Sequence, residues 1–213
     1  MAENAAIPAD DDPADLPDDA DDLDDAVGAE AICRRYGFDY KAKAGREVPE
    51  RFRLVRGVKP TASIRHVFRG RLAGHDLCCF QQTWQVNTGQ ATIPVNHVFF
   101  ITDAPSWPAV TVRRRGGLSR LLDRFRRPPG LSLDRPAFNR TFRVDTEDAD
   151  FAALLLTPEV QDFLLERPAP TWQVLPGALA MIHSGTMKMA RVPLSLERIE
   201  RFWSMVPDEL AWW

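Results

Sequence analysis

Arginine is concentrated in one short stretch of this 213-residue chain. Residues 112–127 carry seven arginines against one acidic residue, a net charge of +6. The seven are Arg113, Arg114, Arg115, Arg120, Arg124, Arg126 and Arg127. Because guanidinium groups match the geometry of phosphate and carboxylate, the segment predicts binding to an anionic partner, either a protein or an anionic membrane surface. Nucleic acid is the weaker candidate, since no recognised nucleic-acid-binding motif accompanies the charge. The alternative is structural: an edge strand and a covering helix whose apolar stripe packs on the chain's own sheet.

The cysteines and histidines do not follow a pattern typical of a metal or catalytic site. Cys78 and Cys79 are adjacent, and adjacent strand residues face opposite sides of a sheet, whereas zinc ligands are usually separated by two to four residues. Ser184 follows His183, but the pair lies in no nucleophile elbow, and there is no P-loop or dinucleotide-binding fingerprint. The sequence therefore assigns no catalytic residue, no metal ligand and no cofactor.

A second interpretation stays open. His66, His97 and His183 fall in three predicted strands and would meet if a pocket lay between two sheets. Such a pocket would make the chain an enzyme or a small-ligand-binding protein. Convergence of the three histidines in a deep polar cleft would favour this alternative, whereas dispersed histidines beside an exposed arginine patch would favour an interaction module.

The charges of the chain are divided along its length. Residues 1–30 hold 12 acidic residues and no lysine or arginine, so residues 31–213 carry +9 within a total net charge of −3. Dense like charges with few large apolar side chains are typical of disorder, which predicts a disordered acidic tail over residues 1–25. We expect this tail to keep the protein soluble or to mask the arginine-rich segment electrostatically, an effect that salt would weaken.

The rest of the pattern predicts an α+β protein, with antiparallel β-sheets flanked by short α-helices. A helix is expected over residues 24–37, and alternating apolar residues predict a meander of about four strands over residues 64–114. An amphipathic helix is expected over residues 118–125.

The second half is predicted to begin with a strand at residues 138–144. Helices are expected over residues 146–156 and 157–166, followed by a tight hairpin at residues 172–183 and a final helix capped by Ser195. The predicted organisation is a tail (1–25), an N-terminal α+β block (26–115), a basic linker with its helix (116–136) and a C-terminal α+β block (137–213).

The sequence also predicts where the protein resides. No stretch approaches the roughly 20 apolar residues that cross a bilayer, and a secretory signal would need positive charge before an apolar run. The three cysteines lack the spacing of a disulfide scaffold, which fits a reducing compartment. We therefore expect a cytoplasmic protein.

Several segments resemble a pattern in uncharacterised bacterial proteins, many of them actinobacterial. The resemblance is carried by Phe138-Asn139-Arg140-Thr141-Phe142-Arg143-Val144, Asp148, Ala152, Leu155-Leu156-Thr157-Pro158 and Leu164-Leu165. With the similar segments at residues 35–40 and 68–80, it covers residues 29–190. The resemblance implies a shared domain without a known activity. Many of those proteins have transmembrane helices near the N-terminus, where this chain has its aspartate-rich tail instead.

Together these features predict a non-enzymatic cytoplasmic interaction module that binds a protein or an anionic surface through residues 113–127.

Overall fold

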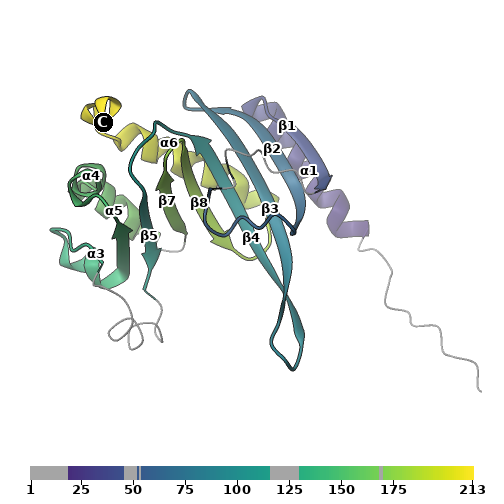
Figure 1. Cartoon of the computed structure of the whole chain (residues 1–213). Helices are drawn as coiled ribbons and strands as arrows, with labels where there is room; N and C mark the ends of the chain where they lie inside the picture. Colours follow the sequence, from purple (N-terminus) through teal and green to yellow (C-terminus); the bar gives the residue numbers. More distant parts are fainter. Residues whose placement is uncertain (1–18, 46–51, 53, 116–129, 168–169) are drawn as a thin grey trace, which may run out of the picture.

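The computed structural model describes residues 19–45, 52, 54–115, 130–167 and 170–213, and one antiparallel sheet of eight strands forms its centre (Figure 1). The strands lie in the order β1-β2-β3-β4-β8-β7-β5-β6. Their bounds are β1 Asp39–Gly45, β2 Ser63–Leu72, β3 His75–Asn87, β4 Thr92–Asp103, β5 Val110–Arg114, β6 Phe142–Thr146, β7 Thr171–Leu175 and β8 Ala178–Ser184. The predicted α+β class is confirmed.

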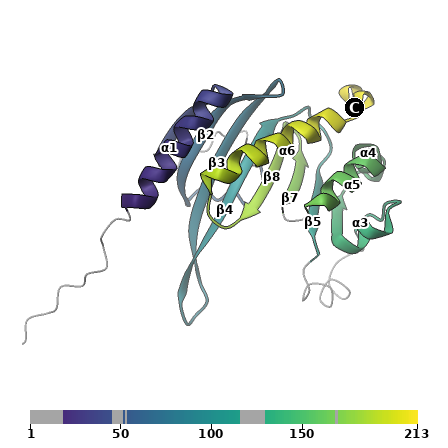
Figure 2. The same cartoon turned by 180° about the vertical axis from the view of Figure 1, so that it is seen from behind.

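The helices lie on one face of this sheet (Figure 2). They are α1 Asp19–Tyr36, α3 Pro136–Thr141, α4 Ala149–Leu155, α5 Pro158–Glu166 and α6 Val192–Met205, with short 3-10 turns η2 Met189–Arg191 and η3 Asp208–Trp212. Ile32, Phe163 and Leu196 project from three of these helices into the larger core. They meet Phe68 and Phe100 from the strands, so burial of this apolar face holds the helices against the sheet.

A second, smaller core covers part of the opposite face. Phe52 and Val55 from the connection between β1 and β2 pack there against Phe80 and Phe99. β3 therefore has buried residues on both sides: Cys78 belongs to this smaller core, and Cys79 belongs to the helical one. The prediction that the two cysteines face opposite sides is confirmed.

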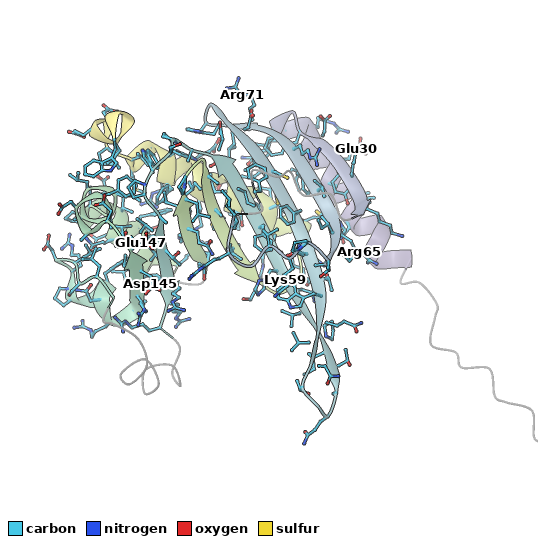
Figure 3. The ribbon with its side chains drawn as sticks, in the orientation of Figure 1. Glu30, Lys59, Arg65, Arg71, Asp145 and Glu147 are labelled. Carbon is cyan, nitrogen blue, oxygen red and sulfur yellow. The ribbon has the colours of Figure 1, made fainter. Side chains whose placement is uncertain are left out.

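Two buried glutamines fix the β1–β2 connection to the sheet. The Gln82 side chain accepts a hydrogen bond from the Lys59 backbone N–H at 2.9 Å and donates one to the Lys59 carbonyl at 2.7 Å. Gln173 makes the same pair of bonds with the backbone of Arg56, at 2.9 and 3.1 Å. Lys59 is labelled on this face in Figure 3. Both amides are satisfied in places where an unpaired polar group would be costly.

The strand order differs from the predicted meander in one respect. β2, β3 and β4 are neighbours, but β5 pairs with β6 and β7, because the β7–β8 hairpin lies between β4 and β5. After β4 the chain passes over the turn of this hairpin, where the Ala104 N–H donates to the Gly177 carbonyl at 3.3 Å and the Gly177 N–H donates to Pro105 at 3.0 Å. A single sheet therefore runs through both predicted blocks, 26–115 and 137–213, and the expectation of two sheets is wrong.

The predicted N-cap at Thr157 is confirmed, and Asp148 caps the preceding helix. The Asp148 carboxylate accepts from the Phe151 N–H at 2.9 Å, and the Thr157 hydroxyl accepts from the Val160 N–H at 3.3 Å, which starts α4 and α5. Pro158 occupies the first turn of α5, as expected.

Other element bounds differ from the predictions. Residues 138–141, predicted as strand, belong to α3, because Pro136 starts a helical turn that buries Phe138 against Phe142 at 5.0 Å between ring centres. α1 begins at Asp19, so residues 19–25 of the predicted tail are helical. Ser195 lies inside α6, whose first turn is set by Pro193. The helix predicted at 118–125 and the tail at 1–18 lie outside the described residues.

Candidate functional site

A cavity of about 400 Å³ opens on the helical face of the sheet, between the start of α6 and the end of β8. We call it the basic cavity. Its cationic lining residues are Arg167, Lys188, Arg191 and Arg198, and His183 adds a titratable ring. None of the described lining residues is acidic. Its apolar lining residues are Val98, Phe100, Pro170, Met187, Val192 and Leu194.

Neighbouring strands position the floor of the basic cavity. Val98 of β4 pairs with His183 of β8, and Phe100 pairs with Met181, so the imidazole stands beside two buried apolar side chains. The Phe100 and His183 rings meet edge to face, with 6.0 Å between their centres. The sheet register therefore fixes where the His183 side chain lies.

The rim is held by the turn that follows β8. The Gly185 N–H donates to the Asn96 carbonyl at 2.8 Å, and the Met187 N–H donates to the buried Gln81 side chain at 2.7 Å. Gly185 has φ +101°, a left-handed conformation that favours glycine. This turn leads the chain through η2 into α6, whose N-cap residue, Arg191, makes no side-chain cap. The positive end of the helix dipole therefore adds to the charge of the cavity wall.

Burial and positive charge together perturb His183. Burial, with smaller contributions from the charges of Arg198 and Arg191, lowers the pKa of His183 to about 4. The ring is therefore neutral at neutral pH. Its Nε2 is buried and has no hydrogen-bond partner within the described chain.

Burial and neighbouring positive charge also act on Arg198. Burial, followed by the charge of Arg167, lowers the pKa of Arg198. Its guanidinium carbon lies 4.7 Å from the centre of the Phe163 ring, and its Nη2 donates to the Arg167 carbonyl at 3.5 Å. Its buried Nε has no partner among the described residues. A guanidinium group with an unused N–H donor, close to other cations, is suited to bind an anion.

The three histidines do not converge. His183 lies on the helical face, whereas His97 lies on the opposite face, 4.8 Å from the Trp84 ring centre. His66 sits at a bulge of β2, where its Nδ1 is 2.9 Å from the Tyr40 hydroxyl. The predicted pocket between two sheets is therefore wrong, because there is one sheet and its two faces separate these side chains. Among the described residues, no three histidine, cysteine or acidic side chains group as metal ligands would.

The arginine-rich segment is described only at its start. The Arg113 guanidinium lies 3.1 Å from the Asp145 carboxylate, labelled in Figure 3, and the Arg115 Nε donates to the Phe142 carbonyl at 2.9 Å. Arg114 is exposed. The remaining four predicted site residues, Arg120, Arg124, Arg126 and Arg127, lie outside the described residues.

Sequence reasoning missed the cations of the basic cavity. Arg167 follows α5, Lys188 precedes η2, Arg191 ends η2, and Arg198 lies in the middle of α6. Acidic residues such as Glu197 and Glu200 alternate with them in the sequence, so no local excess of charge marks them. Only the fold brings these positive charges together.

Comparison with known proteins gives a fold relationship. No family model and no curated protein matches the chain. A solved structure, the crystal structure of the mycobacterial trehalose monomycolate transport factor A, TtfA, superimposes with a TM-score of 0.55. The two chains are 14% identical, and the match covers 86% of this chain and 96% of that one. No helix in the described part of the chain is both long and apolar enough to cross a membrane. The structural match shows that the chain shares the fold of TtfA.

Proposed function

We propose that this protein is a non-enzymatic binding module of the bacterial cytosol whose anionic partner contacts the basic cavity. The observation that carries the proposal is the cavity wall itself, with four cationic side chains and no acidic one among the described lining residues. Like charges this close repel, and a bound anion would relieve the repulsion while pairing with the free Arg198 donor.

The arginine-rich segment fits the same partner. β5 and β8 each pair antiparallel with β7, so they run in the same direction and their C-terminal ends lie at the same end of the strands. Val112 pairs with Trp172, and the neighbouring Thr171 pairs with Ile182, the residue before His183. Arg114 and the basic cavity therefore lie at the same strand end of the sheet. We propose that an extended anionic partner contacts both the cavity and the segment at residues 113–127.

The name of the structural neighbour, a transport factor, is compatible with binding rather than catalysis. At 14% identity the likeness supports the fold alone, so the trehalose monomycolate of that name is not assigned to this chain.

The test is an NMR titration of the full chain with inorganic phosphate, followed through the His183 imidazole signals. We expect saturable shifts that weaken by about tenfold in the double variant Lys188→Gln/Arg191→Gln, which removes two exposed charges of the rim. Arg140→Gln, which removes an exposed arginine of α3, is the control and should leave the affinity unchanged. Shifts that do not saturate, or equal affinity in both variants, would overturn the proposal.

A further inference from the structure

The wall of the basic cavity combines two chemistries that a simple ion does not satisfy together. Two of its cations, Lys188 and Arg191, are exposed at the rim, whereas Arg198 is half-buried. Its floor is apolar, with Val98 and Phe100 at 5% and 2% exposure. An inorganic anion would leave exposed apolar lining such as Leu194 against water, and a neutral apolar ligand would leave the cations unpaired.

Leu194 extends the apolar surface out of the cavity. It lies in the first turn of α6, lines the cavity and is 46% exposed, close to the cations at the rim. Large apolar side chains at such exposure are few among the described residues. A ligand with a hydrocarbon part could cover Leu194 and the floor at once while its charged end meets the cations.

We infer that the basic cavity binds a single-chain amphiphilic anion, an alkyl chain that ends in a carboxylate or a phosphate. This inference rests on the proposed function and names its ligand class. The charged end would lie between Arg191 and Arg198, and the alkyl chain would lie over Phe100 and Leu194. A volume of about 400 Å³ suits the charged end and part of a chain.

The experiment is a calorimetric titration of the full chain with acetate, hexanoate, decanoate and decanol, with decanoate kept below its micellar concentration and decanol below its solubility limit. Each methylene that leaves water strengthens binding, so decanoate should bind at least about tenfold more tightly than hexanoate. Decanol, which has no charge, should bind at least about tenfold more weakly than decanoate. Decanoate binding should also move the His183 imidazole signals.

Two variants separate the two ends of the ligand. Leu194→Ser should weaken decanoate binding and leave inorganic phosphate binding unchanged, whereas Lys188→Gln/Arg191→Gln should weaken both. Leu154→Ser is the matched control, because Leu154 is similarly exposed at 44% but lies on α4 and does not line the cavity. It should change neither affinity.

The outcomes distinguish this inference from the proposed function. If phosphate binds but affinity does not depend on chain length, or decanol binds as well as decanoate, the amphiphile is wrong and the anion-binding function stands. If neither phosphate nor decanoate binds, both are wrong. Flotation with phosphatidylglycerol vesicles, with phosphatidylcholine as control, tests a two-chain ligand: decanoate binding without flotation supports the single-chain anion, whereas flotation that Leu194→Ser abolishes would overturn it in favour of a bilayer lipid.

Discussion

The positive charge of Arg198 acts on the partly buried ring of His183 inside one cavity, and it adds to the effect of burial in holding the pKa of that ring at about 4. The two residues come from α6 and β8, so this coupling exists only in the folded chain. It makes His183 a reporter of charge in the cavity.

Replacing Arg198 with Gln should raise the pKa of His183. The value should stay below 6.5, because burial is the largest cause of the shift and the charge of Arg191 remains. A proton NMR titration of the His183 ring would measure the change. Arg140→Gln should leave the pKa at about 4. An unchanged pKa in Arg198→Gln would show that the two side chains are not coupled.

His183 should make the stability of the protein depend on pH. Its pKa is about 4 in the folded chain and near 6.5 when unfolded, so the unfolded state binds more protons between these values. The free energy of unfolding should therefore fall as the pH drops from 6.5 to 4, with His183 contributing at most about 3 kcal/mol. Urea unfolding of His183→Gln across this range should show a shallower pH dependence. Parallel curves for the two proteins would contradict the prediction.

Gln82→Leu should reduce the free energy of unfolding by about 2 to 3 kcal/mol. The leucine would remove both hydrogen bonds that the buried Gln82 side chain makes with the backbone N–H and carbonyl of Lys59. Chemical denaturation would measure the loss. Gln85→Leu, at an exposed position of the same strand, is the control and should cost less than about 0.5 kcal/mol.

Gly70→Ala should destabilise the fold by about 1 to 3 kcal/mol. A Cβ at this position would lie 2.2 Å from Cδ1 of Phe38, so the two strands could not keep their present separation without moving the ring. The same change should cost much less in a Phe38→Ala background, because the clashing atoms are gone. Equal costs in both backgrounds, measured by thermal or urea unfolding, would exclude the clash as the cause.

Deleting residues 1–18 should strengthen binding of phosphate or decanoate at low salt. The deletion removes six acidic residues and stops before α1 begins at Asp19. If these charges compete for the basic cavity, the gain should shrink as salt screens them, within a Debye length of about 10 Å at 0.1 M. Titrations at two salt concentrations would test this. Equal affinities for the full and shortened chains at low salt would argue against electrostatic masking.

Local signals in the sequence predicted much of the fold. Alternating residues such as Cys78 and Cys79 indicated strands, and Thr157 marked the start of a helix that its side chain caps. Pro176 and Gly177 predicted the hairpin, where Gly177 has φ +82°.

The strand order and the site could not be predicted, because both depend on contacts between distant residues. Nothing near β4 in the sequence indicates that its second neighbour is β8. Arg167 and Arg198 are 31 positions apart and become neighbours only when α5 and α6 pack on the sheet. Local charge counting therefore favoured residues 113–127 and overlooked the basic cavity.

The position of the β7–β8 hairpin has a consequence for synthesis of the chain. A ribosome completes β4 at Asp103, but the strand that pairs with its free edge ends at Ser184. Until then, one edge of β4 and its apolar residues, such as Phe99 and Ile101, remain open to other chains. Fragments that stop before residue 171 are expected to associate through this edge, so pairing of β8 with β4 is the step that covers it.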